Sequence, residues 1–233
     1  MSKKISSYWL LIIAILLLTA ITISYYVITG FHLESYKPYI EQKASQAMGR
    51  KITLNGPIHI KLGWQPIIRI EKITIANAPW SKGTNAATIN QVVLQLDFRS
   101  ILHRKIYLTH VTINGATIKL EKNKQGQYNW PFEKIETLIK SAPTFMLPFN
   151  IKIAADDIAI TLKQPIGLEH EIVVQHADTQ FNDINKFLAI AASGTAKKIP
   201  FKAKVLVNYP ENIADGPYQL KLTINGISTE FII

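Results

Sequence analysis

The sequence predicts a mainly β protein with an N-terminal transmembrane helix and a short amphipathic helix, followed by an antiparallel β-meander whose sheet forms a twisted, open gutter or, as the alternative, a closed β-sandwich or barrel. Three observations predict this. No charged residue occurs between Ser6 and Phe31. From Ile52 onward, apolar and polar residues alternate with the period of two that half-buried strands show. Only two short segments have helical periodicity, too few to cover the apolar rows.

The first 31 residues are predicted to be a membrane anchor. The apolar segment Tyr8–Ile28 is long enough to cross a bilayer, which needs about 20 helical residues. Thr19, Thr22 and Ser24 can hydrogen-bond back to the helix backbone. A cleaved signal peptide is the competing interpretation. However, its apolar region is typically about 7 to 15 residues long and ends in a small-x-small site, and this segment fits neither condition.

The next element is a short helix just outside the membrane. Apolar residues from Tyr36 to Met48 fall near one face, Pro38 lies in the first turn, and Gly49 follows as a natural C′ residue. A second helical candidate spans Pro131–Lys140. We expect residues 32–233 to form one β-rich domain, with a candidate sub-boundary near 131–150.

The remaining elements are short strands, roughly ten to twelve of them. Gly56-Pro57 and the segment Gly63–Pro66 have the composition of turns, and Asn114-Gly115 is expected to be a tight turn between two strands. Each strand presents one apolar row, which something must cover. The sheet can close into a sandwich or barrel, the commoner outcome, or stay open as a gutter whose inner wall binds lipid tails. The pattern alone leaves both forms open.

Composition excludes several functional classes. The 233 residues contain no cysteine, which excludes disulfides, thiolate metal sites and cysteine nucleophiles. The formal net charge of +10 is spread without a basic block. It fits either attraction to anionic headgroups or an ordinary solvated surface. No recognition helix or aromatic-basic motif accompanies the charge, so no nucleic-acid partner is expected.

A series of motifs over residues 1–130 resembles the start of AsmA-family proteins, in the same order. After the apolar N-terminal segment, the motifs are Tyr36-Lys37-Pro38-Tyr39-Ile40, Gly49–Gly56 (GRKITLNG), Leu62–Pro66 (LGWQP), Ile73–Trp80 (ITIANAPW), the step from Ile101-Leu102 to Ile106, Leu120-Glu121 and Gly126–Trp130 (GQYNW). The remainder, with Ser193-Gly194-Thr195, is similar to the family's following segment but less specifically.

The resemblance implies a protein of the Gram-negative inner membrane with a periplasmic β-rich body, related to TamB and to bridge-like lipid-transfer proteins. It places Lys3 and Lys4 in the cytoplasm, an orientation that the charges alone leave open. It also implies binding or conduction of glycerophospholipids along a hydrophobic β-groove toward the outer membrane, without a cofactor. Family members usually run several hundred residues further than Ile233. We therefore expect a short paralogue, a fragment of a longer coding sequence or one module of an assembly.

The groove would be lined by the inward members of the apolar rows. Each methylene removed from water is worth about 0.8 kcal/mol, so a fatty chain gains on the order of 10 kcal/mol there. Packing against another protein side chain is the alternative for each residue. Arg50 is a headgroup candidate because guanidinium pairs with phosphate, although a solvated arginine explains it adequately. The lipid-groove candidates are Leu54, Ile60, Ile75, Leu96, Ile113, Ile160, Val174, Val205 and Leu222.

An enzyme is not expected. The sequence contains no Gly-rich phosphate loop, nucleophile elbow or metal-ligand cluster. His170 and His176 lie about 20 Å apart in a regular strand, and Asp156-Asp157 cannot form a dyad without a bulge. Asn129-Trp130 is interpreted as a loop anchored by a buried indole. The alternative function is assembly of outer-membrane proteins, whose precursors or partner subunits would bind exposed β-edges by strand addition.

Overall fold

The computed structural model describes residues 15–19, 22, 33–97, 107–130, 151–165, 167–182, 187–208, 219–225 and 227–232. The chain divides into two compact units, Met1–Lys37 and Pro38–Ile233. In the first unit, residues 15–19 and 22 are helical. The Thr19 hydroxyl donates to the carbonyls of Ile15 and Leu16, and the Thr22 hydroxyl to that of Leu18. This confirms the predicted back-bonding of these two threonines.

Within the described residues, no helix has the length and apolar character that crossing a membrane requires. Most of the predicted anchor, residues 1–31, lies outside the part of the chain that the structure describes, as do Ser24 and the helical candidate Pro131–Lys140. These remain predictions. The described helices near the N-terminus are η1 (Leu33–Tyr36) and α2 (Lys37–Met48).

The predicted helix end is confirmed. Gly49 has a φ of 65°, and its N–H donates to the Ser45 carbonyl at 2.9 Å. A residue without a Cβ tolerates this left-handed conformation, which terminates the helix and turns the chain into the first strand.

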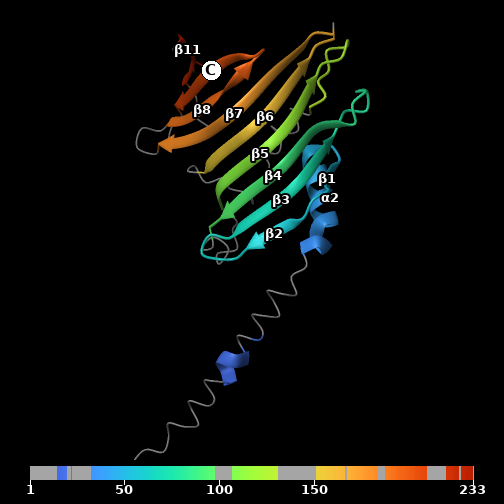
Figure 1. Ribbon diagram of the computed structural model, residues 1–233, viewed down its shortest axis with the longest axis vertical. Helices are drawn as coiled ribbons and strands as arrows, with labels where there is room; N and C mark the ends of the chain where they lie inside the picture. The colour runs from blue at the N-terminus through green and yellow to red at the C-terminus, as the bar shows by residue number, and fades with distance from the viewer. Residues whose placement is uncertain are drawn as a thin grey trace, which may run out of the picture. The chain divides into compact units, whose positions relative to one another are not determined.

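The described strands form a single sheet, shown in Figure 1. Their order is β1-β3-β4-β5-β6-β7-β8-β9-β10-β11, and β2 pairs with β3 beside β1. The strands are β1 (Ile52–Leu54), β2 (Ile58–Lys61), β3 (Ile67–Ala76), β4 (Asn85–Leu96), β5 (Leu108–Glu121), β6 (Lys152–Lys163), β7 (Glu169–Asn182), β8 (Phe187–Ala196), β9 (Ile199–Asn208), β10 (Gln219–Ile224) and β11 (Ile227–Ile232).

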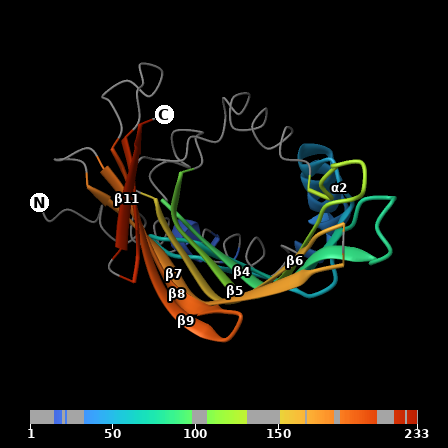
Figure 2. The ribbon, with the colours of Figure 1, turned by 90° about the horizontal axis from the view of Figure 1, so that it is seen from above.

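The predicted antiparallel meander is wrong at one junction, because β5 and β6 pair in parallel. A parallel pair needs a long crossover connection, and the chain from residue 122 to 151 supplies it. The sheet is open, as Figure 2 shows: its strands follow one continuous curve from the β1 side to β11. The open form is therefore the one observed, not the closed sandwich or barrel.

Helix α2 covers the outer edge of β1. The amide of Ile52 donates to the Ser45 hydroxyl at 2.8 Å, and the amide of Leu54 donates to the Glu41 carboxylate at 2.6 Å. The other edge of β1 pairs with β3. Two side chains of the helix thus satisfy backbone donors that would otherwise template pairing with another strand.

A transverse irregularity, which we call the crease, crosses β3 to β7. The register aligns Lys72, Asn90, Gly115, Asp157 and Gln175 in adjacent strands, and pairing is interrupted at each of them. Three of these five residues have positive φ: 52° at Lys72, 62° at Gly115 and 55° at Asp157. The expected turn at Asn114-Gly115 is therefore wrong, because β5 continues through this dipeptide and the glycine provides the crease conformation.

The register shows that apolar residues on both sides of the crease lie on one face. Val174 of β7 pairs with Gly194 of β8, whereas Ala177 pairs with Ala192. Because Gly194 and Ala192 are two residues apart in a regular strand, they share a face. Val174 and Ala177 therefore share it too, although they are three apart. Across β6, β5, β4 and β3, the partners of Val174 are Ile158, Ala116, Ile89 and Ile73, and those of Ala177 are Ala155, Ile113, Val92 and Ile70.

Candidate functional site

The face that carries Val174 and Ala177, here called the apolar face, contains all nine predicted groove residues. Leu54 pairs with Ile73, and Ile60 pairs with Ile68, two residues before Ile70. Leu222 pairs with Val205, two residues after the partner of Ala192. Ile113 and Val174 stand in the two aligned rows. The remaining members, Ile75, Leu96 and Ile160, lie two or four residues along a strand from a residue of those rows, and therefore point to the same side. Contact with lipid at these positions stays a prediction.

The opposite face is polar where the apolar face is aliphatic. Thr53, Thr74, Thr88 and Thr117 stand in one register row across β1, β3, β4 and β5. Threonine suits the pleated backbone and leaves a hydroxyl in water. The two faces therefore differ in chemistry along the same strands.

The described residues cover the apolar face only in part. Leu54, Ile73 and Ile75, near α2, are buried, with exposed fractions of 7 to 9%. Away from the helix, many aliphatic residues in the middle of the sheet are half-buried: Val92, Leu94, Val111, Ile113, Ile160, Ile172 and Val174. Ala116 and Ile158, beside the crease, are buried, with exposed fractions of 6 and 7%. All eleven described strands belong to this one sheet, so within the described residues no second sheet packs over them.

Arg50 joins the end of α2 to the loop that follows β5 through hydrogen bonds. Its Nη1 donates to the Gly49 carbonyl at 3.3 Å, and its Nη2 donates to the Asn129 carbonyl at 3.2 Å. Among the described residues, its buried Nε has no hydrogen-bond partner. These contacts give Arg50 a structural role, and its proposed contact with a headgroup stays a prediction.

The loop that follows β5 is anchored by an amide, so the expectation of a buried indole is wrong. Asn129 is 1% exposed, whereas Trp130 is half-buried. The Asn129 amide nitrogen donates to Asn77 Oδ1 at 2.9 Å and to the Lys119 carbonyl at 2.7 Å, and its Oδ1 accepts from the Glu121 amide at 2.8 Å. An amide can both donate and accept, so one side chain joins β5 to the β3–β4 connection.

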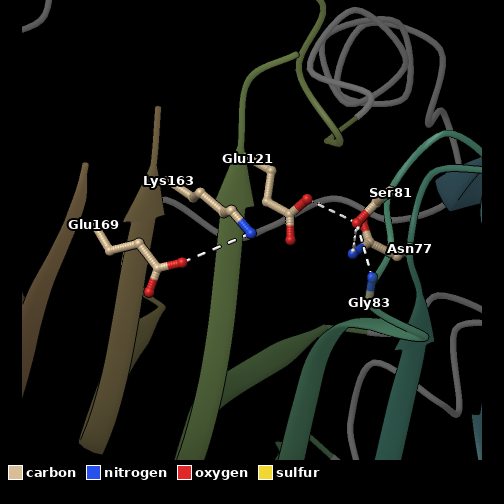
Figure 3. Close-up of polar contacts among 6 residues, drawn as sticks. All are labelled: Asn77, Ser81, Gly83, Glu121, Lys163 and Glu169. Carbon is tan, nitrogen blue, oxygen red and sulfur yellow. Dashed lines mark hydrogen bonds and ion pairs between the residues drawn. The ribbon is translucent and has the colours of Figure 1, made fainter. Parts of the chain in front are cut away.

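Neighbouring polar groups extend this anchor (Figure 3). The Ser81 hydroxyl donates to Glu121 Oε2 at 2.7 Å and accepts from the Asn77 amide nitrogen and the Gly83 backbone N–H. Lys163, at the end of β6, lies 3.7 Å from Glu169 at the start of β7. The ends of β5, β6 and β7 thus meet in a charged region.

A cavity of about 610 Å³ lies at the ends of β5 and β6. Its apolar and aromatic lining includes Leu120, Leu162, Tyr128 and Trp130, and its cationic lining consists of Lys122, Lys124 and Lys163. Sequence reasoning missed these lysines. Two of them, Lys122 and Lys124, shortly precede the turn glycine Gly126, but nothing in the alternation indicates that Lys163 at the end of β6 lies beside them.

The comparison with known families decides the identity of the chain. Residues 1–208 match the AsmA family. The chain belongs to the AsmA family. No curated protein matches it. Membership of the AsmA family supports a general role in the cell envelope and in lipid handling.

In this AsmA-family chain, His176 lies between two carboxylates, those of Asp156 and Asp178. His176 Nδ1 lies 2.6 Å from Asp156 Oδ1, and its Nε2 lies 3.6 Å from Asp178 Oδ1. The hydrogen bond that His176 Nδ1 donates to the Asp156 carboxylate raises the pKa of His176 above its ordinary value. Asp157 provides the bulge that could have brought the two carboxylates together, but Asp156 pairs with His176 instead. Within the described segments, no His, Asp and Glu group is arranged to hold a metal.

Proposed function

We propose that this chain is a periplasmic lipid-binding protein, anchored in the inner membrane of a Gram-negative bacterium, that conducts glycerophospholipids along its apolar face toward the outer membrane. The single observation that carries the proposal is the open sheet, whose aliphatic face is continuous across the crease and carries many half-buried side chains, although Ala116 and Ile158 beside the crease are buried. A contiguous apolar surface of this kind marks a binding site rather than an ordinary solvent face. AsmA-family membership supports the same role.

The proposed mechanism needs binding but no chemistry from the protein. Each buried methylene contributes about 0.8 kcal/mol, so an acyl chain on the apolar face regains most of what it loses on leaving the bilayer. Movement along a face of uniform aliphatic character is then nearly level in free energy. The proposal assigns no catalytic step, metal or cofactor, and the direction of transport must come from outside the sheet.

A pair of adjacent substitutions on β6 tests the proposal. Ile160 lies on the apolar face and Thr161 on the other, because neighbouring residues in a strand point to opposite sides. We expect Ile160→Asp to remove co-purifying phospholipid from the full-length chain, because a buried carboxylate is costly beside an acyl tail. Thr161→Asp should leave the phospholipid in place. Mass spectrometry of extracted lipid gives the amount per chain.

Circular dichroism of both variants distinguishes loss of binding from loss of folding. Equal phospholipid in the folded Ile160→Asp and Thr161→Asp proteins contradicts the proposal. So does a lipid-free wild-type protein.

Strand addition is the second candidate function, and the arrangement of the sheet edges supports it. Whereas α2 caps β1, the described part of the chain gives β11 a partner only on its β10 side. Such an edge suits pairing with an extended segment of an outer-membrane protein precursor or a partner subunit. A lipid-free chain that binds a β-strand peptide saturably favours this function over transport.

A further inference from the structure

Strands β5 and β6 carry a continuous double row of apolar residues that ends at the cavity. Because the two strands are parallel and in register, their apolar residues stand side by side: Val111 with Ile153, Ile113 with Ala155, Ala116 with Ile158, Ile118 with Ile160 and Leu120 with Leu162. The last pair also lines the cavity of about 610 Å³. A hydrocarbon chain extended along the double row would therefore bring its polar end to this cavity.

The cavity has an excess of positive charge. It is lined by Lys122, Lys124 and Lys163, and among the described residues the one acidic side chain in the lining is Glu121. The Glu121 carboxylate accepts a hydrogen bond from Ser81 at 2.7 Å. Lys163 has Glu169 at 3.7 Å, with both side chains about half exposed, and such surface pairs contribute little. The lysines therefore have charge available for an anion.

The hairpin that carries two of the lysines is held in a defined conformation. Lys122 pairs with Tyr128 across the hairpin, and its ammonium lies 5.0 Å from the centre of the tyrosine ring. In the turn, Asn123 Oδ1 accepts from the backbone amides of Gln125 and Gln127, at 3.0 and 2.8 Å. Cations presented by an ordered hairpin lose less freedom when they bind a ligand.

We propose that this cavity binds the phosphate of an anionic glycerophospholipid, while the acyl chains lie on the double row of β5 and β6. This inference rests on the proposed lipid-binding function and deepens it by naming the headgroup charge and the place where it binds. The aliphatic wall of Leu120 and Leu162 fits a lipid better than a free phosphate, which would use the lysines alone. A lysine ammonium binds phosphate as a compact point charge.

The experiment compares two triple variants of the full-length chain in an uncharged detergent. Lys122→Gln/Lys124→Gln/Lys163→Gln removes the cavity cations. The control, Lys61→Gln/Lys152→Gln/Lys204→Gln, removes the same charge from exposed strand lysines elsewhere. Calorimetry measures binding of dihexanoyl phosphatidylglycerol, of uncharged dihexanoylglycerol with the same tails, and of inorganic phosphate.

We expect the cavity variant to bind phosphatidylglycerol about tenfold more weakly, or worse, while its affinity for dihexanoylglycerol is unchanged. The control variant should bind both lipids like the wild type. Added salt should weaken wild-type binding of phosphatidylglycerol but not of dihexanoylglycerol.

The other outcomes overturn the inference in different ways. If both triple variants bind phosphatidylglycerol like the wild type, or lose affinity equally, the headgroup site is wrong while dihexanoylglycerol binding still supports the groove. If inorganic phosphate binds as tightly as phosphatidylglycerol, the cavity is a free-phosphate site. If neither lipid binds to the wild type, the proposed function and the headgroup site both fail.

Discussion

Among single residues, Asn129 makes the contacts on which the loop after β5 depends. Asn129 is 1% exposed, and its side-chain amide satisfies groups on Asn77, Lys119 and Glu121. A buried polar side chain with all its partners stabilises one arrangement, whereas its removal leaves those partners unsatisfied. Arg50 donates a hydrogen bond to the backbone carbonyl of Asn129 in the same loop, so the position of the end of α2 also depends on this loop.

We expect Asn129→Ala to lower the free energy of unfolding by about 2 to 3 kcal/mol, because buried backbone groups lose their partners. Urea denaturation followed by circular dichroism measures the change. The control is Asn55→Ala, which removes a single exposed hydrogen bond to Thr74 and should cost about 0.5 kcal/mol or less. Equal losses in the two variants would show that the network around Asn129 contributes nothing special.

Alternation in the sequence predicted the chemistry of each face residue by residue, but not the cavity. All nine groove candidates share a face because a strand alternates locally, and that property needs no knowledge of its neighbours. The cavity depends instead on which strand ends meet. Lys163 joins the Lys122 hairpin because β6 pairs in parallel with β5, and no local pattern reports that pairing.

Among the elements, the crease explains why the strands from β3 to β7 change the parity of their apolar positions. In β5 the apolar positions run 111 and 113, then 116, 118 and 120, and the change occurs at Asn114-Gly115. A spacing of three next to Asn-Gly is typical of a turn, which is why the sequence predicted one. Only the neighbouring strands distinguish a turn from the crease. The parity of the apolar positions changes at the same level in all five strands from β3 to β7, and this identifies the crease.

Gly115→Ala tests whether the crease needs glycine on β5. An alanine Cβ there would clash with the side-chain amide nitrogen of Asn90, in a backbone with a φ of 62°. We expect a loss of about 1 to 3 kcal/mol in the free energy of unfolding, from the strained conformation and the displaced asparagine. Gly63→Ala is the control, because nothing lies within 4 Å of its added Cβ. A Gly115→Ala protein as stable as the Gly63→Ala protein contradicts this requirement.

For the whole molecule, the central question is what covers the apolar face, and the sequence left two answers. Periodicity is the same in an open gutter and in a closed sandwich, because each strand buries one side in both. Closure depends on pairing or packing between distant strands. In the described part of the chain, the structure shows one open sheet in which many of the central aliphatics remain half-buried, and this supports the proposal that a hydrophobic ligand occupies the face.

The parity change at the crease gives the lipid-transport proposal its sharpest test. We expect a photo-crosslinking residue introduced along β5 to label phospholipid at Ile113 and Ala116, three residues apart, because both lie on the apolar face. Thr112 and Thr117, on the other face, should give little product and serve as controls in the same strand. Mass spectrometry of the adducts measures the yield at each position. Labelling at Ile113 and Thr117 but not at Ala116 would mean that alternation runs straight through the crease, and equal labelling at all four would remove the apolar face as the lipid's path.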